Sequence, residues 1–103
     1  MVCASASDMA LRQARAADRR LARERHGHPL LLCGIPIALK DLYAVRGLPL
    51  TASSRVLENN VASASSAVWA RLREAGMVLL GHTQTHEFGA GSTTDQVGNP
   101  WRL

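Results

Sequence analysis

The first pattern along the chain is a helical spacing of small and apolar residues between Asp8 and Arg25. One face of this helix consists of Ala10, Ala14, Ala17 and Leu21. Ser7 is a suitable N-cap residue, and Asp8 suits the positive end of a helix dipole. Gly27 and Pro29 interrupt the pattern, so we predict a helix over residues 8–25.

An unbroken apolar run follows from Leu30 to Leu39 and ends in two charged residues, Lys40 and Asp41. A run without alternation is typical of a strand that is covered on both faces. Pro36 cannot donate a ladder hydrogen bond, so it favours an edge position or an irregular end for this strand. Lys40 and Asp41 therefore lie where the predicted strand leaves the core.

A second helix and a second strand are predicted further along. The helix begins at Ser65 or Ser66 and ends at Ala75, just before Gly76. Its inward-facing residues are expected to be Val68, Trp69, Leu72 and Ala75. The apolar segment 77–80 then forms a buried strand, and we expect a short helix capped by Thr83 within residues 81–88.

Strand, helix and strand in this order predict a crossover between parallel strands, and hence an α/β fold. The connection over residues 41–60 is long, which is typical of functional or locally helical segments. Two parallel strands do not make a stable sheet, so the chain resembles the opening part of a larger domain. We divide it into residues 1–28, a basic amphipathic helix, and residues 29–103, the first part of that domain.

Composition and charge narrow the class of protein. With 103 residues and 47% apolar content, the chain is within the range of one globular domain. Its positive charge is concentrated in the first helix, where six arginines stand against three acids between Asp8 and Arg25. We interpret this as one solvated helix surface, so no direct contact with nucleic acid is expected.

The two cysteines and the length of the apolar runs indicate the cellular compartment in which we expect the protein. Cys3 and Cys33 form neither a C-x-x-C pair nor a disulfide framework, so a reducing cytoplasm is expected. No apolar run approaches the roughly 20 residues that a helix needs to span a bilayer. We therefore expect neither secretion nor a membrane partner.

Lys40 is the first candidate for a catalytic residue, and its position in the sequence can be interpreted in two ways. On composition alone, a lysine just past a strand end is a solvated surface residue. Alternatively, apolar walls partly desolvate its ammonium, so that it can exchange a proton with a serine nucleophile. Turn and capping chemistry accounts for most of the serines, and no G-x-S-x-G elbow is present. These serines are Ser53, Ser54, Ser63, Ser65, Ser66 and Ser92.

Other candidate sites are weaker. His82 and His86 have metal-ligand spacing, but the sequence lacks the glutamate of H-E-x-x-H, so no metal is expected. Cys33 lies within an apolar run, as an inert core thiol does. The segment from Gly89 to Gly91 lacks the lysine of a phosphate-binding loop. No cofactor is expected.

Four stretches together resemble the N-terminal part of the amidase signature enzymes. They are GIPIALKDL (34–42), GLPLTASS (47–54), AVWARLREAGMVLLGHTQTHEF (67–88) and GNPW (98–101). Their order and spacing make the match specific. The resemblance implies the amidase signature fold, in which helices surround a mixed, partly parallel sheet, and implies that the fold is incomplete in these 103 residues.

The resemblance also implies a reaction on a small-molecule amide. Members hydrolyse the amide bond, or transfer its acyl group, through a serine nucleophile, a second serine in a cis peptide linkage, and a lysine. Lys40 matches that lysine, which would accept a proton relayed from the nucleophile by the second serine. Asp41 and Glu87 also match the family pattern, and we expect structural roles for them.

The sequence departs from the family pattern in three places that matter here. The family usually shows lysine and asparagine in GKTN, where this chain has His82 and Gln84, and TAGS appears as TASS, with Ser53 replacing glycine. The segment that carries both catalytic serines follows shortly after NPW in the family, whereas this sequence ends at Leu103. We therefore expect these residues by themselves to be inactive and to need the remaining part of the amidase domain.

Three hypotheses follow. The first is an amidase fragment that contributes Lys40, and the second is a non-catalytic remnant or small binding module. The third is a link to RNA, either directly through the arginines of the first helix or as a subunit that amidates aminoacyl-tRNA, as one branch of the family does. The sequence leaves open the amide substrate, the choice between hydrolysis and transfer, and the oligomeric state.

Overall fold

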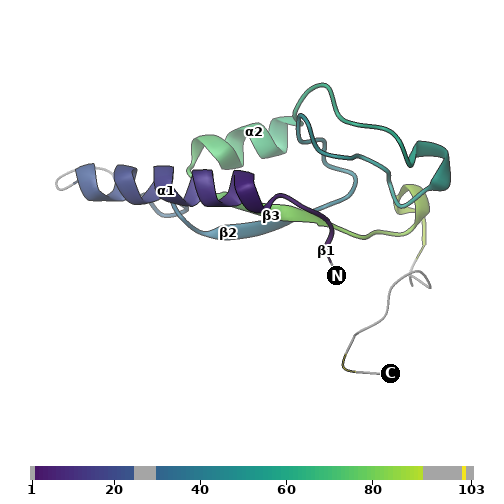
Figure 1. The fold of residues 1–103 in the computed structure, drawn as a ribbon, viewed down its shortest axis with the longest axis horizontal. Helices are drawn as coiled ribbons and strands as arrows, with labels where there is room; N and C mark the ends of the chain where they lie inside the picture. The colour runs from purple at the N-terminus through teal and green to yellow at the C-terminus, as the bar shows by residue number, and fades with distance from the viewer. Residues whose placement is uncertain (1, 25–29, 92–100, 102–103) are drawn as a thin grey trace.

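A computed structural model describes residues 2–24, 30–91 and 101 of the chain. Its main elements are β1 (Val2–Ser5), α1 (Ser7–Arg23), β2 (Pro36–Lys40), α2 (Ala67–Glu74) and β3 (Val78–Thr83). Two short 3-10 helices span Arg55–Leu57 and Glu87–Gly89. Both α-helices lie on the same side of the sheet, and the long loop after β2 extends beyond the sheet's end (Figure 1).

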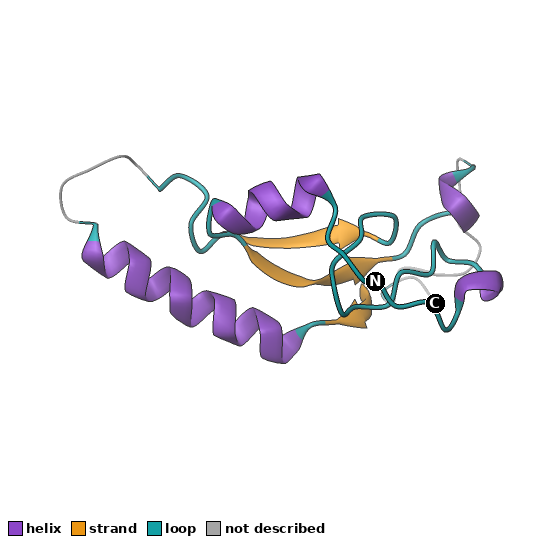
Figure 2. Ribbon diagram, turned by 90° about the horizontal axis from the view of Figure 1, so that it is seen from above, coloured by secondary structure: helices purple, strands orange, loops and turns teal. Residues whose placement is uncertain are grey.

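The sheet has the order β1-β3-β2, with β3 in the centre. β2 pairs with β3 in parallel, whereas β1 pairs with β3 antiparallel. The three strands therefore form a mixed, partly parallel sheet. Seen from above, its strands are visible in the gap between the two helices that cover one of its faces (Figure 2). The predicted α/β fold is confirmed, and β1 is an element that the sequence analysis did not predict.

α1 confirms the first predicted helix, but its start differs. Ala6 is the N-cap and no side chain caps the helix, so the prediction that Ser7 is the cap was wrong. The reason is that the backbone N–H of Ala6 still donates to Leu80 O (3.1 Å), which carries the β1–β3 pairing up to the first helical residue. Gly27 and Pro29, which we expected to end the helix, lie outside the described residues.

β2 is shorter than the apolar run that predicted it. Residues 31–34 form turns and the strand begins at Pro36, an edge position in the sheet, as predicted from that proline. The expectation of a strand covered on both faces was wrong for the described residues, because both helices lie on one side. Ala38 of β2 is exposed, and Leu80 of β3 is 46% exposed.

α2 confirms the second predicted helix. The Ser66 hydroxyl caps it by accepting from Trp69 N (3.3 Å), and Gly76 follows its end. Trp69 is 1% exposed and packs in the core with Leu39, Val45 and Leu79. Val68, in contrast, is 46% exposed, so its predicted inward position was wrong.

The short helix expected within residues 81–88 is largely replaced by strand. β3 continues through Thr83, which is therefore a strand residue and not a cap, and only Glu87–Gly89 form a 3-10 turn. Pairing with β1 on one side and β2 on the other is what extends β3 over these polar residues.

No helix in the described ranges is long and apolar enough to cross a membrane. The division at residues 28 and 29 falls where the structure is not described, so it stays a prediction.

Candidate active site

Lys40 is the last residue of β2, opposite Thr83 of β3. Its neighbours Leu39 and Asp41 are buried on the helix side of the sheet, whereas Lys40 is exposed. Since successive side chains of a strand point to opposite faces, the ammonium lies on the face that α1 and α2 leave open. The apolar walls that the sequence suggested around Lys40 are thus not formed by the described residues.

Asp41 is the polar anchor at the end of β2. Its carboxylate is 2% exposed and accepts hydrogen bonds from the backbone N–H of Thr51 (3.2 Å) and from the Thr51 hydroxyl. The backbone N–H of Asp41 donates to Thr83 O (2.9 Å). Asp41 therefore joins the ends of two strands to the loop that follows, in keeping with the structural role expected for it.

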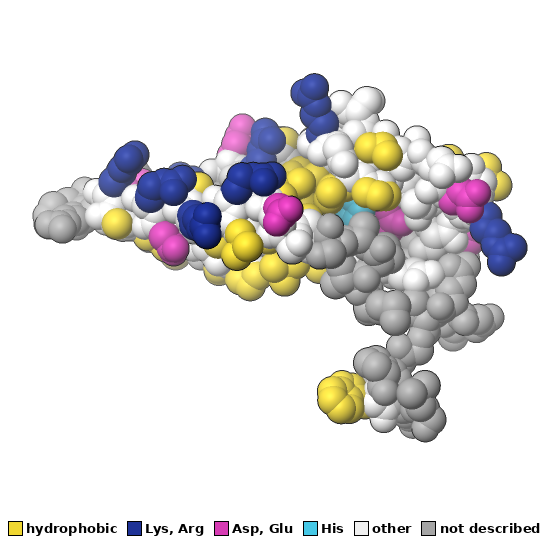
Figure 3. Space-filling model, viewed as in Figure 1, with side chains coloured by type: hydrophobic (Ala, Val, Ile, Leu, Met, Phe, Trp, Pro, Cys, Tyr) yellow, Lys and Arg dark blue, Asp and Glu magenta, His cyan; other side chains and the backbone are white. Residues whose placement is uncertain are grey.

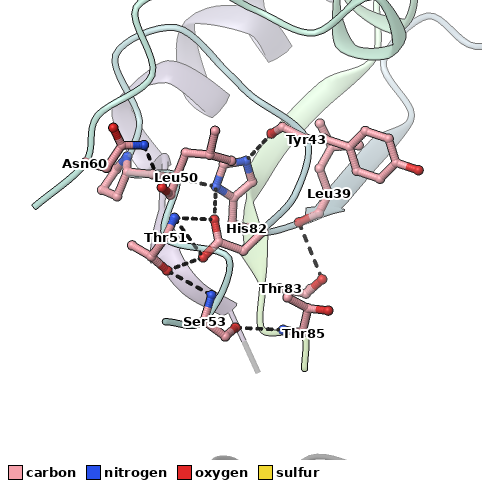
Figure 4. A network of polar contacts seen from close by, with 11 residues as sticks. Leu39, Tyr43, Leu50, Thr51, Ser53, Asn60, His82, Thr83 and Thr85 are labelled. Atoms are coloured by element: carbon pink, nitrogen blue, oxygen red, sulfur yellow. Dashed lines mark hydrogen bonds and ion pairs between the residues drawn. The ribbon is translucent and has the colours of Figure 1, made fainter. Parts of the chain in front are cut away.

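His82 lies inside β3, opposite Leu39, and is fully buried. Its Nε2 lies 2.9 Å from Tyr43 O, and its Nδ1 lies 3.0 Å from Pro49 O (Figure 4). The Asp41 carboxylate lies 3.5 Å from Nδ1. The ring thus holds the two ends of the loop segment 43–49 against the central strand.

The two histidines considered as metal ligands have different surroundings. His82 is a strand residue, whereas His86 caps the 3-10 helix with its backbone, so they do not share one helical face. Among the described residues, no group of three or more histidine, cysteine or acidic side chains could hold a metal ion.

The loop over residues 51–54 has an unusual backbone. Ala52 and Ser53 both have positive φ angles, of 50° and 55°. Hydrogen bonds hold this conformation, because Ser53 N donates to the Thr51 hydroxyl (3.2 Å) and the Ser53 hydroxyl accepts from Thr85 N (3.0 Å). A left-handed conformation at residue 53 explains why the family pattern has glycine there.

Ser54 and Glu87 connect the same loop to the segment after β3. The Ser54 hydroxyl, in a side chain that is 4% exposed, donates to Glu87 Oε1 (2.7 Å). This contact agrees with the structural role expected for Glu87. An open groove of about 500 Å³ lies beside it, lined by Ser53, Ser54, Arg55, Val56, Gln84 and Glu87.

The described candidates for a nucleophile, Ser53, Ser54 and Cys33, contact groups other than Lys40. Ser53 and Ser54 use their hydroxyls to hold the loop, and Cys33 is buried with its Sγ 3.8 Å from Ala17 O, which confirms its core position. Ser92 and residues 98–100 lie outside the described part of the chain.

The arrangement around Asp41 and His82 is what reasoning from the sequence missed. A usable signal was present, because both polar residues sit at the carboxyl ends of neighbouring parallel strands, where such ends meet at one edge of a sheet. The sequence pattern places His82 just before a predicted helix capped by Thr83, and this prediction hid its proximity to Asp41.

Comparisons with known proteins identify relatives of this chain. Two similar proteins are glutamyl-tRNA(Gln) amidotransferase subunits A. The one from Microcystis aeruginosa is 46% identical over 101 residues, and the one from Acidothermus cellulolyticus is 41% identical over 102 residues. The matches cover 93% and 94% of this chain but 20% of each relative, so the chain spans about a fifth of their length.

A solved structure gives the same result for the fold. It is a vestigial protein complex that reveals the evolutionary origins of an s-triazine catabolic enzyme. It matches 84% of this chain and 19% of its own chain, with a TM-score of 0.75 and 33% identity. The family model described as Amidase matches residues 2–103. The resemblance found in the sequence is confirmed, and the chain belongs to the amidase family as the N-terminal part of its domain.

Proposed function

We propose that this chain is the N-terminal part of an amide-bond hydrolase in which Lys40 transfers the proton. The observation that carries the proposal is the position of Lys40, at the carboxyl end of β2 and on the uncovered face of the sheet. Ligands of open α/β sheets bind outside the carboxyl ends of their strands. An exposed sheet face with apolar residues such as Leu80 also needs a partner layer, which the rest of the domain would supply.

In the proposed reaction, a serine of the remaining domain attacks the carbonyl carbon of the amide. Its proton passes to a second serine, and the proton of that serine passes to the neutral Nζ of Lys40. When the C–N bond breaks, the proton returns from Lys40 to the leaving nitrogen. Water then releases the acyl group by the same relay, so the lysine ends in its starting state.

Residues 1–103 by themselves are expected to be inactive. The proposed serines and the oxyanion donors come from the remaining domain, and the loss of one oxyanion donor alone costs about 3 kcal/mol of transition-state stabilisation. Lys40 without these groups has nothing to deprotonate.

A second candidate function is ammonia transfer to an aminoacyl-tRNA. It is favoured by the similar proteins from Microcystis aeruginosa and Acidothermus cellulolyticus, which are subunits of glutamyl-tRNA(Gln) amidotransferases. In that case the chain would work with other subunits. Both functions use the same amide chemistry at Lys40. Both are also compatible with the cytoplasmic location that we expect because the cysteines of the chain form no disulfide framework.

The test is a chimera in which these 103 residues replace the matching fifth of the Microcystis aeruginosa relative. We expect amide hydrolysis by the chimera, none by the 103-residue chain, and loss of activity in the chimera with Lys40→Ala. Arg46→Ala, which removes another exposed cation of the same loop region, is the matched control and should retain activity.

Three results would change the function that we propose for this chain. A Lys40→Ala chimera that keeps full activity would remove Lys40 from the reaction. A chimera that hydrolyses glutamine but no longer amidates glutamyl-tRNA(Gln) in the presence of the other subunits would count against the amidotransferase. A stable, monomeric 103-residue chain whose chimera is inactive would favour the non-catalytic module.

Direct binding of RNA is tested by measuring affinity at increasing salt concentration. Binding through the arginines of α1 would weaken steeply as salt is added, and an affinity that does not weaken would exclude direct contact through these arginines.

A further inference from the structure

His82 has an oxygen acceptor at each of its ring nitrogens. Nε2 lies 2.9 Å from Tyr43 O, and Nδ1 lies 3.0 Å from Pro49 O. A carbonyl oxygen only accepts hydrogen bonds, so each nitrogen must carry a proton to bond its carbonyl. A neutral imidazole has one N–H and would direct a lone pair at one of the two oxygens. The geometry therefore suits the imidazolium form.

Asp41 supplies the negative charge that such a buried cation needs. Its Oδ1 lies 3.5 Å from Nδ1 of His82, and the two side chains are 2% and 0% exposed. Charges buried to this extent are tolerated only when they are paired and hydrogen-bonded. Asp41 also accepts hydrogen bonds from the N–H and the hydroxyl of Thr51, which suits the ionised, acceptor-only carboxylate.

The pair acts on the end of β2 through the backbone. Asp41 follows Lys40 directly and is held by His82, by Thr51 and by its own N–H bond to Thr83 O. With Asp41 fixed on the helix side of the sheet, Lys40 is fixed on the opposite face. His82 also holds the loop that begins at Tyr43, so the chain after Lys40 cannot turn without breaking buried hydrogen bonds.

We infer that His82 is a buried imidazolium, paired with Asp41, and that this pair is a positioning device for Lys40. The positioning role rests on the function proposed for Lys40, whereas the charge state of His82 does not. The family pattern usually has lysine where this chain has His82. An ammonium also donates to carbonyl oxygens and carries the same charge, so His82→Lys should preserve the device.

The charge state is tested directly by NMR of the 103-residue chain labelled with ¹⁵N-histidine at pH 7. We expect both ring nitrogens of His82 to show a bound proton, with the signals assigned by their loss in His82→Lys. His86, which is not fully buried and whose side chain does not cap the following turn, is the internal reference. A bare ring nitrogen in His82 would overturn the inference.

The positioning role is tested in the chimera with His82→Gln, His82→Lys and the control His86→Gln. Glutamine removes the charge, and we expect kcat to fall about 100-fold with little change in KM, the loss typical of a slightly misplaced catalytic group. His82→Lys should return kcat to the level of the unaltered chimera, and His86→Gln should leave it there. Equal activity of the glutamine and lysine variants at His82, at any level, would overturn the positioning role.

The two proposals fail separately. An active Lys40→Ala chimera would remove the function proposed for Lys40, and the NMR result would still decide the charge state of His82. If His82→Gln does not fold, the comparison of His82→Lys with the unaltered chimera decides the role, because a loss of kcat in a folded lysine variant contradicts it.

Discussion

The side chain of Gln13 in α1 accepts a hydrogen bond of 2.8 Å from the backbone N–H of Leu79 in β3. Leu79 is fully buried, and the register of β3 against β2 shifts immediately after it. A side chain of the first helix thus satisfies a backbone donor of the central strand next to an irregular point of the sheet. The contact holds α1 in place over a core of small residues that includes Ala10 and Ala17.

Gln13→Leu should destabilise the chain by about 1–3 kcal/mol, because it leaves the buried N–H of Leu79 without this acceptor. Gln13→Glu keeps an acceptor oxygen at the same position and should cost less. Urea denaturation of the two variants measures the difference. Equal stability of the leucine and glutamate variants would contradict this role for Gln13.

Gly76 and Gly47 offer a matched pair for separating backbone strain from crowding. Both have positive φ angles, of 87° and 85°, but a Cβ at Gly76 would lie 2.8 Å from Cys33 Sγ, and one at Gly47 would meet nothing within 4 Å. Gly47→Ala should cost about 1–2 kcal/mol from the left-handed backbone alone. Gly76→Ala should cost clearly more in the same denaturation experiment, and equal costs would show that Cys33 gives way freely.

Ser53 combines a left-handed backbone with a hydrogen bond to Thr85 N. Ser53→Ala loses the hydrogen bond and keeps the strain, so we expect a loss of about 1 kcal/mol. Ser53→Gly loses the same bond but relieves the strain by about 1–2 kcal/mol, so its stability should equal or exceed that of the original chain. Thermal unfolding of the two variants checks the order, which would be reversed if residue 53 were not left-handed in solution.

Lys40→Ala should change the stability of the chain by less than about 0.5 kcal/mol, because the side chain is exposed. Thermal unfolding of the chimera with and without Lys40→Ala then separates a loss of chemistry from a loss of folding. A large loss of stability in the chain, measured by thermal unfolding, would show that Lys40 has a structural contact.

Leu80 lies on the open face of the sheet and is 46% exposed. Several other large apolar side chains are exposed in the described part of the chain, among them Leu31, Leu32 and Ile35, and apolar surface is visible along the lower side of the molecule (Figure 3). Leu80→Lys should reduce self-association of the 103-residue chain, because it interrupts an apolar surface. In the chimera the same change should be destabilising, since the residue would then be covered. Sedimentation of the chain and thermal unfolding of the chimera measure the two effects.

Local sequence patterns determined much of the fold. The helical spacing before Arg25, a start at Ser65 or Ser66 and the Gly76 stop predicted both helices, and Pro36 predicted an edge position or an irregular end for β2. The family resemblance followed from motifs whose order is itself a property of the sequence. These features depend on residues that are close together along the chain, so they can be predicted from the sequence alone.

The tertiary structure decided the features that join distant residues. β1 is too short to be recognised alone and exists because Val2–Ser5 pair with β3, and the same pairing keeps β3 a strand where its polar residues suggested a helix. Nothing in the sequence pattern indicated that His82 and Asp41 contact each other. They became a buried pair only when parallel pairing placed two strand ends side by side, because charge pairing depends on distance in space and on the exclusion of water.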